Sequence, residues 1–212
     1  MAEDRLRLWE VLFARALEII DSVGAAGVAR EDWSFGGGTV LMLRHRHRIS
    51  KDVDIFVSDP QYLGFLTPRL NTTAESLTSN YIEQAGFLKL YFPEGEIDFV
   101  ASAPLTQAPT TTQVLLGRKV EVETSAEIVA KKLWHRGEQF TARDLFDLAL
   151  VAEKEPSTLW PIKPVLESRR DPVLRRIESQ EAALREAFAA LEILDYSRSF
   201  EECVELVRKA LG

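Results

Sequence analysis

The sequence predicts an α/β (α+β) protein, in which a mixed first half is followed by an all-helical second half. Short strand-like and helix-like runs alternate up to residue 124, and from Ser125 onward apolar residues recur at helical spacing. The chain has 212 residues, 46% of them hydrophobic, which is enough for one large domain or two small ones. We therefore expect a core over residues 1–124 and a helical region over residues 125–212.

The composition also excludes several classes of protein. The single cysteine, Cys203, rules out an internal disulfide framework and fits a reducing compartment. No apolar run approaches the roughly 20 residues of a membrane helix, and the N-terminus lacks the apolar stretch of a signal peptide. We expect a cytoplasmic protein with no membrane partner. The formal charge of -7 argues against sequence-independent coating of nucleic acid, but it allows a local basic site.

The first half begins with an amphipathic helix, in which Trp9, Phe13, Ala16 and Ile20 fall on one face. A short strand then runs into three glycines, and a helix-compatible run follows over residues 39–43. Strand composition predicts strands over 33–35, 53–57, 87–92, 96–100, 112–116 and 119–122, the last four as two hairpins. The stretch between the second and third of these, residues 61–83, reads as mixed and helical in part.

The second half is predicted to consist of helices separated by prolines. Thr124 and Glu127 have the spacing of a capping box, so the first helix is expected to begin there. Helices are predicted over 126–136, 141–154, 159–169, 172–195 and 198–211, with breaks at or near Pro156, Pro161, Pro164 and Pro172.

Two short elements carry chemistry. Gly36-Gly37-Gly38-Thr39 forms a junction between a strand and a helix, where glycines and a helix N-terminus can admit a phosphate. Asp52 and Asp54 lie two residues apart on a strand, so their carboxylates share a face and favour a bound cation. Asp98 lies in another strand and has apolar neighbours like those of Asp54. If the two strands are adjacent, the three carboxylates form a triad that suits Mg²⁺.

Taken singly, each element is more typical of a turn or of a solvated strand edge, and only their order and spacing make them specific. The pattern GGTxL beginning at Gly37, followed by RxSxDxDxF beginning at Arg48, resembles the polymerase-β-like nucleotidyltransferases. Within them the sequence is most similar to the AbiEii/AbiGii toxin branch. The segment ending in Lys132-Leu133 and the pattern RDLFDL beginning at Arg143 resemble the same branch. The resemblance covers roughly residues 30–150.

This resemblance implies a nucleotidyltransferase-fold sheet core with flanking helices and a role for each matching position. The glycine junction and its neighbours would bind the nucleotide: Gly37, Gly38, Thr39, Arg48, Ser50 and Lys132. The carboxylates Asp52, Asp54 and Asp98 would ligate Mg²⁺, and Asp98 could also act as the base for the acceptor hydroxyl. Asp144 would complete the site or orient Lys132. Glu96 remains an alternative to Asp98, and Lys131 an alternative to Lys132.

The implied activity is Mg²⁺-dependent transfer of a nucleotide from an NTP to an acceptor hydroxyl. The implied role is the toxin of a toxin–antitoxin or abortive-infection system, with a cognate antitoxin and an RNA such as tRNA as acceptor. A small-molecule nucleotidyltransferase of the antibiotic-modifying type is one alternative. A catalytically silent binding module on the same fold is another, although the glycines, the carboxylates and the lysine together favour an enzyme.

The basic run from Arg44 to Lys51 can be interpreted in two ways. It is either a solvated loop or a basic rim that binds phosphate or an RNA backbone. His45 and His47 are not expected to hold zinc, because no cysteine lies near them in the sequence.

Overall fold

The computed structural model describes residues 5–24, 29 and 32–212. The chain forms two compact units. The first, here called the sheet unit, comprises Met1–Val40, Ser50–Pro104 and Thr110–Glu123. The second, the helical unit, comprises Leu41–Ile49, Leu105–Pro109 and Thr124–Gly212. Two short segments from the first half of the chain therefore belong to the helical unit.

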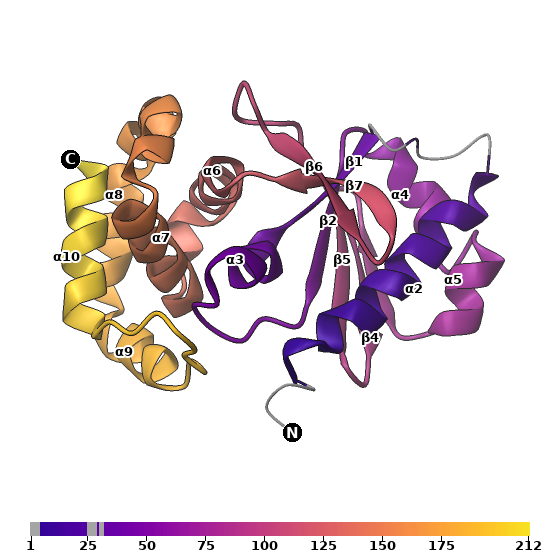
Figure 1. The fold of residues 1–212 in the computed structure, drawn as a ribbon, viewed down its shortest axis with the longest axis horizontal. Helices are drawn as coiled ribbons and strands as arrows, with labels where there is room; N and C mark the ends of the chain where they lie inside the picture. The colour runs from indigo at the N-terminus through magenta and orange to yellow at the C-terminus, as the bar shows by residue number, and fades with distance from the viewer. Residues whose placement is uncertain (1–4, 25–28, 30–31) are drawn as a thin grey trace. The chain divides into compact units, whose positions relative to one another are not determined.

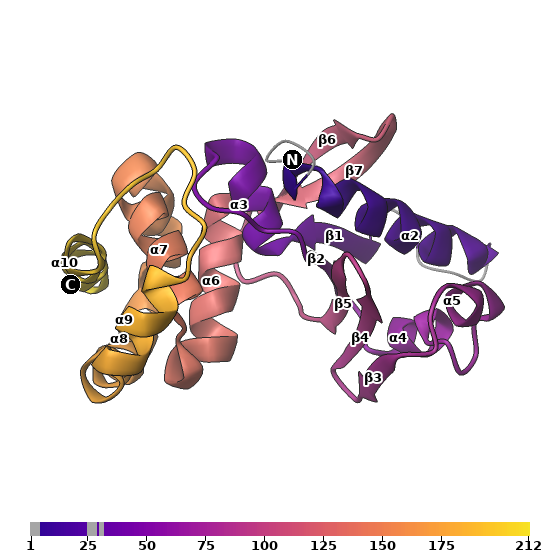
Figure 2. The ribbon, with the colours of Figure 1, turned by 90° about the horizontal axis from the view of Figure 1, so that it is seen from below.

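The sheet unit contains a seven-stranded mixed sheet with the strand order β3-β4-β5-β2-β1-β7-β6 (Figures 1 and 2). The strands are β1 (Trp33–Gly36), β2 (Val53–Val57), β3 (Tyr81–Gln84), β4 (Phe87–Phe92), β5 (Gly95–Ala101), β6 (Thr110–Leu115) and β7 (Arg118–Glu123). The pairs β2–β5 and β1–β7 are parallel, and the other pairs are antiparallel. The mixed sheet confirms the predicted fold class, and both predicted hairpins are present.

One face of this sheet packs against helix α2 (Leu8–Ser22), which lies along the sheet in Figure 1. The ring centroids of Phe13 and Phe35 are 4.6 Å apart, and those of Trp9 and Phe35 are 6.0 Å apart. Burying an aromatic ring of this kind stabilises the fold by about 2–3 kcal/mol. Strand residues alternate between the two faces, so the residues between the buried positions, Asp54 and Asp98 among them, lie on the other face. We call this second side of the sheet the carboxylate face.

Three helices connect the first strands of the sheet, and the first of them, α3, continues into the helical unit. Helix α3 (Gly37–His45) begins directly after β1, as the glycine junction predicts. The stretch 61–83 contains α4 (Gln61–Leu66), α5 (Thr72–Leu77) and the start of β3, a strand that the sequence interpretation missed. The side chain of Asn71 caps α5 by accepting a hydrogen bond from the N–H of Ala74 at 2.9 Å.

The helical unit consists mainly of α6 (Ser125–Arg136), α7 (Ala142–Lys154), α8 (Lys163–Ser179), α9 (Glu181–Ala189) and α10 (Phe200–Leu211), with 3₁₀ turns η3 (Gly137–Gln139) and η4 (Pro156–Ile162). Phe146, Phe188 and Phe200 form a chain of edge-to-face contacts with 5.6 Å between successive centroids. Thr124 caps α6 by accepting the N–H of Glu127, so the helix begins where the spacing predicts. The side chain of Glu127 does not complete the capping box but accepts hydrogen bonds from Leu105 and Thr106.

The predicted helix boundaries between residues 159 and 195 are wrong, because the structure has η4, α8 and α9 there with different ends. Pro172 lies inside α8 instead of ending a helix. The N–H that a proline lacks would have bonded to the carbonyl of Ser168, and the exposed position of Ser168 lets water take its place. The predicted helix 172–195 is instead the second half of α8 followed by α9, with a break at Gln180, and α9 ends at Ala189. Beyond α9, residues 192–195 pair with the basic run. The N–H of Asp195 bonds to the carbonyl of Arg46, and the N–H of Leu194 bonds to that of His47.

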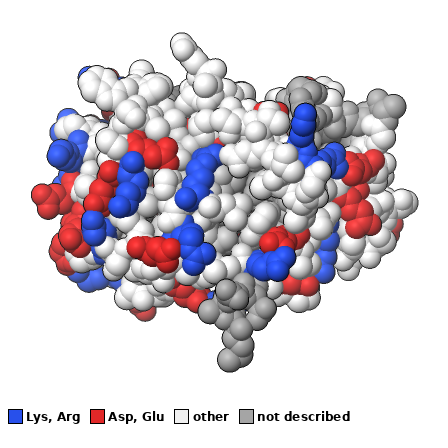
Figure 3. All heavy atoms as spheres, viewed as in Figure 1, with Lys and Arg blue, Asp and Glu red and all other residues white. Residues whose placement is uncertain are grey.

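The surface carries charges of both signs. On the face shown in Figure 3, acidic and basic side chains are interspersed over the C-terminal helices. Among the residues that the structure describes, no helix has the length and apolar character needed to cross a membrane.

Candidate active site

The carboxylate face carries a row of four residues in register on four adjacent strands, one of them a glycine and three with charged side chains. Gly36 of β1 pairs with Asp54 of β2, Asp54 pairs with Asp98 of β5, and Asp98 pairs with Lys89 of β4. Residues in register on adjacent strands have backbones about 5 Å apart and side chains on the same face. The strand adjacency on which the predicted carboxylate group depends is therefore present for Asp54 and Asp98.

The glycines of the junction make room for two carboxylates. A Cβ on Gly37 would lie 1.9 Å from Oδ2 of Asp54, and its φ of +72° is a conformation that favours glycine. A Cβ on Gly36 would lie 2.2 Å from Oε2 of Glu123. Glu123 is buried at the end of β7, and its Oε1 accepts a hydrogen bond from the hydroxyl of Ser34 at 3.1 Å. The sequence interpretation missed this carboxylate, which no motif distinguishes.

Thr39 and Ser50 fix the backbone beside Asp52. The hydroxyl of the fully buried Thr39 donates to the carbonyl of Asp52 at 2.5 Å and lies 3.0 Å from the hydroxyl of Ser50. Oδ1 of Asp52 accepts the N–H of Glu96 at 3.2 Å. Asp52 itself lies just before β2 and not on the strand as expected, so it does not take part in the strand register that aligns Asp54 with Asp98. Thr39 links the start of α3 to the residue that precedes β2, and Asp52 directs one oxygen towards β5.

Asp98 has one oxygen engaged and one without a partner. The ammonium of Lys89 lies 2.8 Å from Oδ2 of Asp98 and 2.5 Å from Oε2 of Glu96. Oδ1 of Asp98 is buried and has no hydrogen-bond partner among the described residues. Burial raises the pKa of Asp98 to about 6; the charge of Asp54 acts in the same direction, and the hydrogen bond from Lys89 opposes both.

This donor set fits a divalent cation in chemistry. Oxygen ligands suit Mg²⁺, the buried Oδ1 of Asp98 has no hydrogen-bond partner among the described residues, and Gly37 places no Cβ against the carboxylate of Asp54. The residues that would hold the ion are Asp52, Asp54 and Asp98. Within the described ranges, however, no three Asp, Glu, His or Cys side chains are already gathered closely enough to hold a metal. Asp54 and Asp98 therefore share one face of the sheet and Asp52 lies just before β2, but the three carboxylates are not drawn together.

The predicted site residues of the helical unit form an ion cluster of their own. The ammonium of Lys132 lies 2.8 Å from Oδ1 of Asp144 and 3.1 Å from Oδ2 of Asp147. Asp144 also forms a capping box with Thr141 at the start of α7. Burial would lower the pKa of Lys132, but the two carboxylates outweigh it and raise that pKa above its ordinary value.

Asp147 is the centre of this cluster and was not assigned a role from the sequence. It is fully buried and accepts hydrogen bonds from Nε and Nη2 of Arg48, both at 2.8 Å, and from Nε2 of His47 at 2.8 Å. Burial would raise the pKa of Asp147, but Arg48 and Lys132 hold it well below its ordinary value. We call Arg48, His47, Lys132, Asp144 and Asp147 the Asp147 cluster.

The choice between the two adjacent lysines depends on which one reaches Asp144. Lys131 instead lies 3.5 Å from Glu127, one turn earlier on α6. The carboxylate of Glu127 accepts hydrogen bonds from the N–H groups of Leu105 and Thr106, so it fixes the segment 105–109. Of the two lysines, the structure brings Lys132 to Asp144.

The basic run is largely occupied by interactions with acids of the helical unit. His47 and Arg48 are buried in the Asp147 cluster. Nε of Arg46 bonds to Asp195 at 2.8 Å, and Nε2 of His45 lies 2.5 Å from Glu155. Arg48, predicted to bind the nucleotide, thus directs its guanidinium to Asp147, and neither histidine takes part in a metal-binding group among the described residues.

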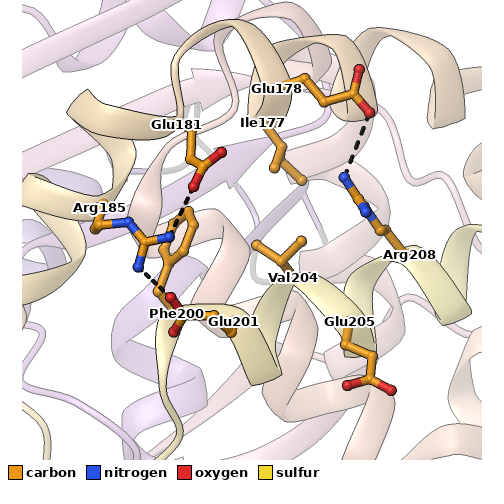
Figure 4. Close-up of a pocket in the computed structure, with 9 residues that line it drawn as sticks. All are labelled: Ile177, Glu178, Glu181, Arg185, Phe200, Glu201, Val204, Glu205 and Arg208. Atoms are coloured by element: carbon orange, nitrogen blue, oxygen red, sulfur yellow. Dashed lines mark hydrogen bonds and ion pairs between the residues drawn. The ribbon is translucent and has the colours of Figure 1, made fainter.

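A groove between α8, α9 and α10 contains none of the predicted site residues (Figure 4). Its floor includes Phe200, and Arg185 bridges its rim by pairing with Glu181 at 2.8 Å and with Glu201. The guanidinium of Arg185 also stacks on the Phe200 ring, 4.6 Å from its centroid. These contacts hold the helices together, and we assign the groove no role.

Comparisons with known proteins identify a family and a fold for the chain. The family model described as "Nucleotidyl transferase AbiEii toxin, Type IV TA system" matches residues 24–210. Among solved structures, the chain is similar to MenT4, a nucleotidyltransferase toxin from Mycobacterium tuberculosis H37Rv, with 17% identity and a TM-score of 0.56 over 98% of this chain and 83% of that one. It is also similar to JHP933 from Helicobacter pylori, with 14% identity and a TM-score of 0.52 over 93% and 88%. At such low identity, these structures show the fold alone. No curated protein matches the sequence.

Proposed function

Because the chain belongs to the AbiEii nucleotidyl transferase toxin family and is a nucleotidyltransferase, we propose that it transfers a nucleotide from an NTP to a hydroxyl of RNA, such as a tRNA, with the help of Mg²⁺. The observation that carries this proposal is the register of Asp54 and Asp98 beside the Gly36–Gly37 junction. We further propose that the protein is the toxin of a toxin–antitoxin system with a cognate antitoxin, acting in the cytoplasm, where NTPs and tRNA are found.

The proposed roles follow from charge and position. Asp52, Asp54 and Asp98 would hold Mg²⁺, and the bound ion would neutralise charge that develops on the transferred phosphoryl group. Asp98 would accept the proton of the attacking hydroxyl, since its Oδ1 has no hydrogen-bond partner among the described residues. The glycine junction would receive the phosphates at the start of α3. Lys132, made more basic by its two acidic neighbours, would bind nucleotide phosphate as a cation.

The test is an assay in which each of the four NTPs, labelled at the α-phosphate, is incubated with the protein, Mg²⁺, total RNA and a small hydroxylated compound. We expect label to appear in an RNA band only when Mg²⁺ is present. Label on a small hydroxylated compound, with none on RNA, would support the antibiotic-modifying alternative. Absence of transfer to any acceptor would contradict the enzyme assignment.

The variants Asp52→Asn and Asp54→Asn are each expected to reduce transfer by a factor of about 10² to 10³, since removal of a group that stabilises transition-state charge has effects of this size. Asp59→Asn, an exposed change of the same type in the loop after β2, serves as the control and should retain activity. Induced expression of the unaltered chain should slow growth, and expression of Asp54→Asn should not. Equal growth would contradict the toxin role.

A further inference from the structure

Lys89 holds the third carboxylate of the proposed metal site. It lies directly opposite Asp98 in the antiparallel pair β4–β5, in the row that continues to Asp54. Its ammonium reaches Oδ2 of Asp98 at 2.8 Å and Oε2 of Glu96 at 2.5 Å, and a quarter of its side chain is exposed. A positive charge carried by the chain itself therefore contacts the carboxylate to which a divalent cation is proposed to bind.

The position of Lys89 offsets the repulsion between the carboxylates of Asp54 and Asp98 on this face of the sheet. Two carboxylates in register on adjacent strands repel each other, and partial burial makes the repulsion stronger. Lys89 offsets that repulsion at Asp98, and it does so through one oxygen only. The other oxygen, Oδ1, is buried without a hydrogen-bond partner among the described residues. Oδ2 of Asp98 is thus paired with an ammonium, whereas Oδ1 remains as an acceptor for a further cation.

We propose that Lys89 is a built-in counter-cation that competes with the divalent metal for Asp98 and thereby weakens metal binding at the site. The inference rests on the proposed function, because it assumes that Asp98 is a metal ligand. In the absence of metal, the ammonium stabilises the carboxylate face. When a divalent ion reaches Asp98, its charge and the ammonium repel each other at short range, so binding requires the metal to offset the loss of the Lys89 contact.

The competition can be measured without catalysis. Isothermal titration calorimetry of the full chain with Mn²⁺, in the absence of NTP, gives the dissociation constant of the metal. Lys89→Met keeps the aliphatic stem and removes the charge, and we expect it to bind Mn²⁺ about tenfold more tightly than the unaltered chain, since the repulsion between an ammonium and a divalent ion a few Å apart is lost. Lys89→Arg keeps the charge and should bind Mn²⁺ as the unaltered chain does.

Lys119→Met is the matched control. It removes the same charge from the same sheet, but β7 lies three strands from β5 in the sheet order. We expect its affinity for Mn²⁺ to stay within twofold of that of the unaltered chain. An equal gain in both methionine variants would mean that net charge alone acts, and it would overturn the role of Lys89. Unchanged or weaker binding in Lys89→Met would overturn it as well.

A second measurement separates this inference from the proposed function. Asp54→Asn should abolish Mn²⁺ binding both in the unaltered chain and in the Lys89→Met background. If Asp54→Asn binds Mn²⁺ as before, the metal is elsewhere and the proposed site itself fails. Should Lys89→Met fold poorly, Lys89→Gln retains a hydrogen-bond donor for Asp98 and allows the same titration. Its affinity for Mn²⁺ should also rise, and an unchanged value would contradict the competition.

Discussion

Arg48 and Asp147 form a two-point ion pair in which Nε and Nη2 of the arginine each donate to one carboxylate oxygen at 2.8 Å. Both side chains are buried, and His47 adds a third hydrogen bond to the same carboxylate. Breaking a buried pair by removing one partner leaves the other charge without compensation. This geometry makes Asp147 a structural requirement of the helical unit.

Asp147→Asn should therefore destabilise the protein by about 3–5 kcal/mol, because Arg48 and Lys132 lose their common counter-charge. Chemical denaturation measures the change in the free energy of unfolding. Asp195→Asn is the matched control, since it also removes an Asp–Arg pair, but one in which more than half of each side chain is exposed. Its effect should stay within about 1 kcal/mol. Similar losses in both variants would contradict the importance of burial.

His47 predicts a pH dependence of stability. Burial lowers the pKa of His47 below 6.5 although the hydrogen bond to Asp147 opposes the shift, and Nδ1 has no hydrogen-bond partner among the described residues. The unfolded chain therefore takes up the proton first as the pH falls. The stability that the neutral ring provides is present above about pH 6.5 and is lost as the pH falls from there through the lowered pKa of the folded state.

The contribution of His47 to the free energy of unfolding should accordingly decrease between pH 7 and pH 5, by at most about 1.4 kcal/mol per pH unit for this one proton. His47→Gln keeps an N–H donor near Asp147 and cannot titrate, so its decrease should be shallower. Denaturation curves at several pH values give the two slopes, and the difference between them cancels the contributions of His135 and Asp98, which are common to both proteins. Equal slopes would show that His47 does not titrate differently in the folded state.

A substitution at Gly37 tests whether the close contact between this glycine and the carboxylate of Asp54 is needed for activity. Gly37→Ala should abolish nucleotide transfer and destabilise the sheet unit, because the new Cβ would overlap Oδ2 of Asp54. Gly117→Ala is the control, since Gly117 has a similar positive φ of +76° but no atom within 4 Å of its Cβ position. Its cost should be limited to about 1 kcal/mol of backbone strain, with transfer retained. Equal activity in the two variants would contradict a role for Gly37.

The adjacent lysines of α6 provide a fourth test. Lys132→Gln is expected to reduce nucleotide transfer about 100-fold or more, measured at a temperature where circular dichroism shows the variant to be folded. Lys131→Gln should retain most of the activity, because Lys131 lies beside Glu127 instead of Asp144. A larger loss in Lys131→Gln would mean that the other lysine is the functional one.

The sheet and the order of its motifs were predictable because they depend on local signals. The apolar neighbours of Asp54 and Asp98 indicated two similar strands, and the register then placed the two carboxylates opposite each other. Lys89 and Glu123 were not predictable, because only the pairing of β4 with β5 and the approach of β7 to the glycine junction bring them to the carboxylates. Such contacts depend on tertiary packing, which no short motif encodes.

The helical half shows the same limit. Periodicity predicted α6, α7 and α10 closely, and the spacing of Thr124 and Glu127 indicated where α6 begins. It failed at residues 192–195, where backbone hydrogen bonds to Arg46 and His47 replaced a helical turn. The basic run, which resembled a solvated loop or an RNA-binding rim, is instead largely paired with acids. This pairing was not predictable, because Asp147 lies about a hundred residues later in the chain.

The membership of Leu41–Ile49 in the helical unit has a practical consequence for any attempt to divide the protein. A cut at residue 124 would separate Arg48 and His47 from Asp147. In the C-terminal fragment, the carboxylate of Asp147 would then keep only Lys132 of these three partners. The fragment 125–212 should therefore not fold when expressed alone. Domain exchange between relatives would need to carry residues 41–49 together with the C-terminal helices, so these two distant segments are expected to change in concert.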